Sequence, residues 1–281
     1  MKKSLLIAAA FMCACGILWA QPKSFGTPQL LIKAGQGLMA PTWSPDGSKI
    51  AVTGDNFIGI YVADADGSNL KQVSDATGAG YKMTWSDAQN ITSTPYTMVN
   101  NRRMTRIENV NVKTKAVSEV APAARDFKPS KALKRSNAVL QTMLDNPLNA
   151  TNLIPTLNEY SGKMVLNPAL SPDGSKIAFQ IVSYGLFVCN ADGSDVRSLG
   201  KGSHASWLPD NVNVMVTRIE DNGDVFTKSD IYCVNTANGS AVNITPNTQA
   251  IPVTIAVSPD GKKVAFDNDT DGCIYVIDLK Y

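Results

Sequence analysis

The amino-acid sequence predicts an all-β fold: a six-bladed β-propeller of four-stranded antiparallel blades, its ring closed by the N-terminal strand. The first observation is a repeated octapeptide, "SPDGSKIA", at 44–51 and 171–178, with a looser copy, "SPDGKKVA", at 258–265. The second is the spacing of these copies, 127 and 87 residues, which is close to three and two periods of about 43. A fixed period of this size is typical of stacked structural repeats.

The third observation is a second turn inside each repeat. In "SPDG", Pro45 sets the φ angle of a turn and Gly47 can adopt the left-handed conformation that closes a hairpin. About twenty residues later follow "ADADGSN", "CNADGSD" and "VNTANGSA". Each unit therefore contains four short strands joined by three hairpins. Since one such unit cannot bury both faces of its sheet, units of this kind stack as propeller blades.

The rest of the chain fits the same period. Trp43, Trp85 and Trp207 fall at one equivalent apolar position, where we expect packing between blades. Six units account for residues 21–281 as a single domain. The third unit, about 123–165, is degenerate: "SKALKRSNAVLQTMLD" has leucines at near-helical spacing. We interpret it as a decayed blade, the alternative being a helical insertion.

The two ends of the chain predict the closure of the ring. The last unit stops at "IYVIDLKY", which leaves it without a fourth strand, and the N-terminal "TPQLLIKAGQGL" can supply that strand. Closure of this kind leaves no long exposed sheet edge.

Residues 1–20 are predicted to be a secretory signal. Two lysines precede a short apolar run, and Ala20 is the preferred cleavage position. We therefore expect a periplasmic or secreted protein. The alternative is a lipid anchor on Cys13 or Cys15.

Three cysteines follow the predicted signal: Cys189, Cys233 and Cys273. Alignment of the repeats places them in or beside the third strands of different blades. Those strands lie farther apart than the roughly 7 Å between Cα atoms that a disulfide allows, so free thiols are expected.

Charge argues against nucleic-acid binding. The chain has 26 basic and 24 acidic residues, and removal of the two signal lysines leaves 24 of each. A nucleic-acid-binding domain normally shows a basic excess. The charge is unevenly placed, since residues 102–135 carry a net +7 and residues 210–278 a net −6. Either these are solvated outer strands, or Arg102, Arg103 and Arg106 form a basic flank that attracts an acidic partner.

At this point "PTWSPDGSKIAV" and "IYVADADGSNLKQVS" resemble the TolB-type, WD40-like propeller repeat, also found in tricorn protease and prolyl-oligopeptidase-like enzymes. The chain has no room for the domain that precedes the TolB propeller and lacks the G-x-S-x-G motif of a peptidase domain. The resemblance implies a free-standing, non-enzymatic scaffold for protein–protein or ligand binding. The alternative is an enzyme acting on glycans or polyuronides, because some related propellers are lyases.

Candidate site residues are few. Those lyases rely on several histidines and a metal, whereas this chain has only His204, so we predict no catalytic residues. Lys82 and His204 are the candidates for ligand binding at the channel mouth. No cofactor is expected; the alternative is a calcium ion bound by the loop carboxylates Asp267, Asp269 and Asp271. We expect a monomer without a transmembrane segment, whose partner is an unidentified envelope protein or polymer.

Overall fold

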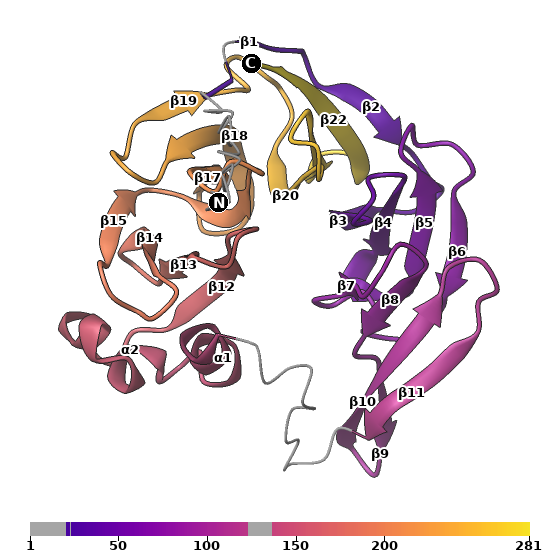
Figure 1. Ribbon diagram of the computed structural model, residues 1–281. Helices are drawn as coiled ribbons and strands as arrows, with labels where there is room; N and C mark the ends of the chain where they lie inside the picture. The colour runs from indigo at the N-terminus through magenta and orange to yellow at the C-terminus, as the bar shows by residue number, and fades with distance from the viewer. Residues whose placement is uncertain (1–20, 23, 123–136) are drawn as a thin grey trace, which may run out of the picture.

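The computed structural model describes residues 21–22, 24–122 and 137–281. These residues form five antiparallel sheets arranged around a common axis, which is a β-propeller (Figure 1). The predicted fold class is therefore confirmed, but the prediction of six blades is wrong, because the described residues contain five. The predicted signal, residues 1–20, lies outside the described part of the chain.

Four blades run from the innermost to the outermost strand in chain order. Blade I contains β3 (Leu38–Trp43), β4 (Lys49–Gly54), β5 (Ile60–Asp64) and β6 (Lys71–Ser74), with a short 3₁₀ turn η1 (Asp55–Phe57). Blade II contains β7 (Thr84–Trp85), β8 (Asn90–Ser93), β10 (Arg102–Asn111) and β11 (Val117–Pro122), with β9 (Tyr96–Val99) paired to β10. Blade III contains β12 (Val165–Leu170), β13 (Lys176–Ile181), β14 (Gly185–Asn190) and β15 (Arg197–Gly200). Blade IV contains β16 (Ser203–Trp207), β17 (Asn213–Asp221), β18 (Phe226–Asn235) and β19 (Ala241–Asn243).

Blade V is completed by the N-terminus. It contains β20 (Pro252–Val257), β21 (Lys263–Asn268) and β22 (Cys273–Lys280). Strand β2 (Gln29–Ile32) pairs antiparallel with β22, and the two-residue β1 (Ser24–Phe25) pairs farther along the same strand. The predicted closure by the N-terminal strand is therefore confirmed.

The predicted third unit is helical where it is described. In place of strands, the chain forms α1 (Ala138–Asp145), α2 (Ala150–Leu153) and η3 (Pro155–Tyr160). Asn137 caps α1 by accepting a hydrogen bond from the Leu140 amide. The decayed-blade interpretation is thus wrong for residues 137–160. The apolar residues there recur at helical spacing, and a helix buries them on one face. Residues 123–136 lie outside the described part.

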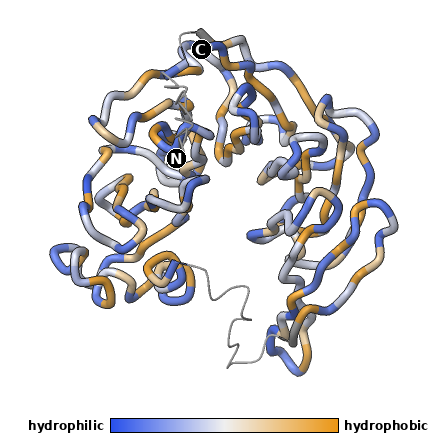
Figure 2. The backbone as a smooth tube through the Cα atoms, in the orientation of Figure 1, coloured by the Kyte–Doolittle hydropathy of each residue, from blue (hydrophilic) through white to orange (hydrophobic). Residues whose placement is uncertain are grey.

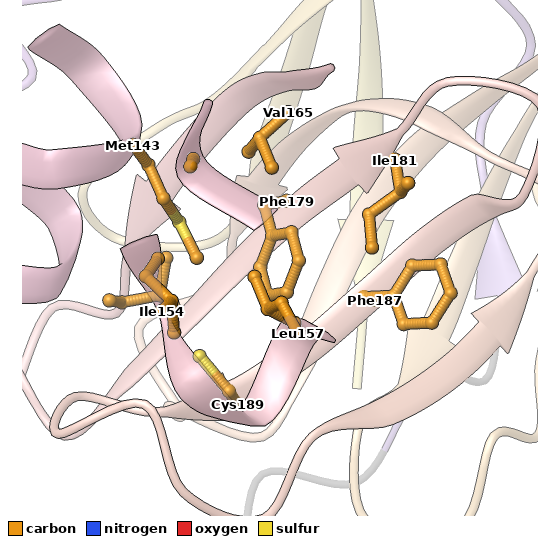
Figure 3. Close-up of a cluster of buried hydrophobic side chains, with 10 residues drawn as sticks. Met143, Ile154, Leu157, Val165, Phe179, Ile181, Phe187 and Cys189 are labelled. Atoms are coloured by element: carbon orange, nitrogen blue, oxygen red, sulfur yellow. The ribbon is translucent and has the colours of Figure 1, made fainter. Parts of the chain in front are cut away.

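The helices cover blade III. Met143, Ile154 and Leu157 are buried against strand residues Phe179 and Phe187 in one cluster (Figure 3). Along the strands of the blades, apolar and polar residues are interleaved (Figure 2), as expected of sheets with buried faces.

The repeated tetrapeptide forms the same turn in each clear copy. The Ser44 amide donates to the Lys49 carbonyl, the Ser44 hydroxyl donates to the Asp46 carboxylate at 2.6 Å, and Gly47 has φ +69°. The hydrogen bond from Ser44, with those from Ser48, holds the pKa of Asp46 below its ordinary value of 3.8. The copies at Ser171 and Ser258 repeat the serine–aspartate bond.

The equivalent tryptophans connect neighbouring blades, as predicted. Each indole N–H donates to a backbone carbonyl on the innermost strand of the preceding blade, in the pairs Trp43 to Ala256 (3.1 Å), Trp85 to Thr42 (3.2 Å) and Trp207 to Ala169 (2.9 Å). Cys189, Cys233 and Cys273 are buried free thiols on β14, β18 and β22, which confirms the cysteine prediction. Burial raises the pKa of Cys189 and of Cys233 to about 12.

Candidate functional site

One end of the ring carries every predicted site residue. Neighbouring strands in a blade are antiparallel, so the turn between the second and third strands lies at the same end as the connection to the next blade. We call this end the channel mouth. Lys82, His204, the arginines of β10 and the loop at 269–272 all belong to it.

Lys82 and His204 occupy the same position of the repeat. Each lies three residues before the repeat-equivalent tryptophan of its innermost strand. The backbone there is left-handed, with φ near +50° at Ala40, Lys82, Asn167 and His204. In β3, β12 and β16 this position coincides with a β-bulge, where the strand register shifts. Bulges turn side chains out of the ladder, and non-glycine residues in this conformation cluster at functional sites.

His204 is half-buried on blade IV. Its Nδ1 atom is buried and has no hydrogen-bond partner among the described residues. Burial lowers the pKa of His204, and the negative charge of Asp267 partly opposes that effect. The imidazole is therefore mostly neutral at neutral pH. Lys82 is exposed on blade II, with its Nζ 5.5 Å from the centre of the Tyr81 ring. Because His204 belongs to blade IV, the structure does not bring the two predicted residues together.

An aromatic hollow of about 510 Å³ lies where blades I and II meet at the mouth. Pockets of this size are typical of ligand sites. Phe57 and Tyr81 contact edge to face at 5.2 Å, and the Arg103 guanidinium lies 4.0 Å from the centre of the Tyr96 ring. A side chain at Gly78 would clash with Tyr96, since a Cβ there would come within 2.6 Å of the ring. The lining residues are Asn56, Phe57, Gly78, Tyr81, Thr94, Tyr96, Arg103 and Thr105.

The three predicted arginines belong to a hairpin formed by β9 and the start of β10, residues 96–106, which we call the basic hairpin. Asn100 and Asn101 both have positive φ, as a tight type I′ turn requires. Arg102 and Arg103 are exposed. Arg106 instead pairs with Glu108 at 2.9 Å, and Glu108 is only 3% exposed. The three side chains therefore differ: two are accessible cations, and the third neutralises a buried carboxylate.

The three predicted calcium ligands do not converge. Asp267 is buried and accepts hydrogen bonds from the Ala40 amide (3.0 Å) and from the amide and hydroxyl of Thr254 (2.6 and 2.7 Å). Asp271 accepts from Asn268, Tyr275 and the Cys273 amide inside its own hairpin, while Asp269 is exposed. Within the described ranges, no three His, Cys, Asp or Glu residues are grouped so that they could hold a metal ion. Asp267 connects blade V to blade I.

The aromatic hollow was missed by sequence reasoning. Tyr81 is adjacent to the predicted Lys82, and Tyr96 begins the strand that leads to Arg102. Phe57 comes from the turn after the second strand of blade I. The only sequence signal for the hollow was that all three aromatics stand in the segments that form the mouth.

The described part of the chain contains no helix that is long and apolar enough to cross a membrane. No model of a known protein family matches the chain, and no curated protein matches it either.

Solved structures do match it. TolB from Acinetobacter baumannii is 14% identical, with a TM-score of 0.39; the match covers 87% of this chain and 55% of that one. An oligogalacturonate lyase in complex with manganese is 16% identical, with a TM-score of 0.46 and coverage of 92% and 80%. A gluconolactonase from Xanthomonas campestris is 9% identical, with a TM-score of 0.43 and coverage of 90% and 89%. TolB is thus among the similar structures, and this chain spans about half of the TolB chain's length.

Proposed function

We propose that this protein is a non-enzymatic binding scaffold, periplasmic or secreted, that docks an acidic partner at its channel mouth through the basic hairpin. The observation that supports it is the contact of Arg103 with Tyr96 at the rim of the aromatic hollow. A cation fixed on an aromatic ring, beside an accessible second arginine, is a ready site for carboxylates.

The chemistry of the site favours recognition. A guanidinium that stacks on an aromatic ring can still donate hydrogen bonds from its N–H groups to a carboxylate. Because the side chain is already ordered, it loses little conformational entropy on binding. The walls of the hollow, formed by Phe57 and Tyr81, can bury an apolar side chain of the partner, and buried aromatic contacts dominate binding energy at interfaces. Tyr96 and Arg103 lie on the paired strands β9 and β10, so their geometry is fixed before binding, whereas Phe57 and Tyr81 come from turns.

The test is capture of partners from an envelope extract. We expect Arg102→Glu with Arg103→Glu to abolish capture of a partner that the wild type retains, and added salt to weaken the wild-type contact, because exposed charges are screened over about 10 Å at moderate ionic strength. Arg106 stays unchanged, since its reversal would place a second carboxylate beside buried Glu108.

The control is Lys71→Glu with Lys262→Glu, which reverses two exposed basic charges at the end opposite the mouth and should leave capture intact. Equal capture by the wild type and the arginine reversal, at low salt, would contradict the proposal.

One observation favours the alternative, an enzyme acting on glycans or polyuronides. The Nδ1 atom of half-buried His204 has no hydrogen-bond partner among the described residues, and the negative charge of Asp267 acts on the imidazole. A neutral imidazole of this kind can act as a general base. Incubation with oligogalacturonates and with sugar lactones tests it. If the wild type turns over one of these substrates and His204→Ala does not, the enzyme hypothesis replaces the scaffold proposal.

A further inference from the structure

A second long hairpin stands at the channel mouth, on blade IV. Strands β17 and β18, of nine and ten residues, are with the ten-residue β10 the longest strands in the described part of the chain, and they meet at the turn between Asp221 and Phe226. We call residues 219–227 the acidic hairpin. Glu220, Asp221 and Asp224 are exposed there, and Val225 and Phe226 expose 60% and 37% of their surface.

The basic hairpin on blade II is opposite in charge and also exposes apolar side chains. Arg102 and Arg103 are exposed, and Met98 and Met104 expose 60% and 56% of their surface. Beside them lies the aromatic hollow. Each hairpin therefore combines exposed apolar side chains with charge of one sign, which is the composition of a binding surface and not of a solvated strand.

The two hairpins point from the same end of the ring. Both are turns between the second and third strands of a blade, and blades II and IV are not neighbours in the ring (Figure 1). Within one molecule the hairpins are thus held apart. Two molecules placed mouth to mouth, with a two-fold axis lying between them, can bring each basic hairpin against the acidic hairpin of the other.

We infer that this protein associates with a second copy of itself, mouth to mouth, the acidic hairpin of each copy resting on the basic hairpin and aromatic hollow of the other. Val225 and Phe226 supply the apolar contact with the hollow, and Asp221 and Asp224 face Arg102 and Arg103. The inference goes beyond the proposed function and replaces the expectation of a monomer. It shares the basic hairpin with that function but is tested on purified protein alone.

A second copy is the occupant that the charges favour. The same chain carries both complementary surfaces, so one kind of contact made twice satisfies both and closes the assembly at two molecules. Charge complementarity of this kind sets the orientation of partners and disfavours wrong pairings.

Sedimentation velocity over a concentration series is the test, at low and at high salt. We expect the wild type to form dimers that salt weakens. Arg102→Glu with Arg103→Glu makes both hairpins acidic, and Asp221→Lys with Asp224→Lys makes both basic. Each double variant alone should raise the dissociation constant by about tenfold or more, because like charges then meet at both contacts.

The decisive arm mixes the two double variants in equal amounts. Both contacts of a mixed pair are again complementary, so heterodimers should form. The chain that carries all four substitutions should also dimerise, since both charges are exchanged. The control, Lys71→Glu with Lys262→Glu, changes exposed lysines at the end opposite the mouth and should dimerise like the wild type.

Two results would overturn the inference: a wild type that stays monomeric throughout the series, or a mixture that fails to associate although each variant keeps the wild-type melting temperature. A second copy and another partner would compete for the same basic hairpin, but self-association is measured on purified protein and capture on envelope extract, so failure of one is distinguishable from failure of the other.

Discussion

The joint between blades V and I and the helix-covered face of blade III are held together by different interactions. At the joint between blades V and I, directional hydrogen bonds supplement a shared apolar core: Trp43 to the Ala256 carbonyl, the Ala40 amide to Asp267, and the Leu38 amide to the Gly272 carbonyl at 2.8 Å. Beside blade III, the face is covered by α1, α2 and η3 through a mainly apolar cluster.

The difference shows what the repeat provides. Where the repeat is intact, the same residue types stand at the same positions, so neighbouring blades meet in a fixed register with the same polar contacts. Where the repeat is lost, apolar area still has to be buried, and helices bury it without matching a strand ladder. A propeller blade can therefore be covered by something that is not a blade.

The largest effect is expected from removing the closure. Deletion of Phe25–Gly37 takes away β2, exposes the outer edge of β22 and removes buried Ile32 from the core shared by blades V and I. We expect loss of cooperative thermal unfolding of the whole ring, measured by circular dichroism. The control is Leu30→Ala, because Leu30 is on β2 but 54% exposed. A truncated protein that melts like the parent would show that the N-terminal strand is dispensable.

The helix-covered face of blade III should respond to a single core substitution. Leu157 is fully buried against blade III, so Leu157→Ala should lower the free energy of unfolding by about 2–5 kcal/mol through lost contacts and a cavity. Leu153→Ala is the matched control: Leu153 is 56% exposed, and a change of only about 0.5 kcal/mol is expected. Urea titration measures both. Equal losses of unfolding free energy in the two variants would mean that packing of the helices on blade III does not stabilise the protein.

The smallest effect compares the closing joint with the others. Trp43→Phe removes one indole hydrogen bond and should lower the free energy of unfolding by about 1 kcal/mol. Trp207→Phe, between blades III and IV, removes the equivalent bond and should cost a similar amount. A much larger loss for Trp43→Phe would show that the closing joint is the weak point of the ring.

Much of the fold could be predicted from local signals. The "SPDG" turns, the tryptophan position and the missing fourth strand of the last unit each determine short-range geometry, and all three are confirmed. The sequence does not decide between strands and helices for the third unit, because leucines at near-helical spacing also occur in decayed strands.

The site was less accessible to sequence reasoning. The arginines stood out by charge density, but Arg106 pairs with Glu108 because the two residues stand two apart on one face of β10, which charge counts do not contain. The aromatic hollow combines Phe57 of blade I with Tyr81 and Tyr96 of blade II, and only tertiary packing brings those segments together.

The left-handed position at the mouth has a consequence for how such a ring can diversify. Alanine, lysine, asparagine and histidine stand at this position in blades I to IV, all with nearly the same left-handed backbone. Four chemically different side chains are therefore compatible with one backbone conformation, whereas Thr254, at the equivalent position of blade V, does not have positive φ. A rim of this kind can change what it presents to the solvent one blade at a time, while the sheets that carry it stay the same.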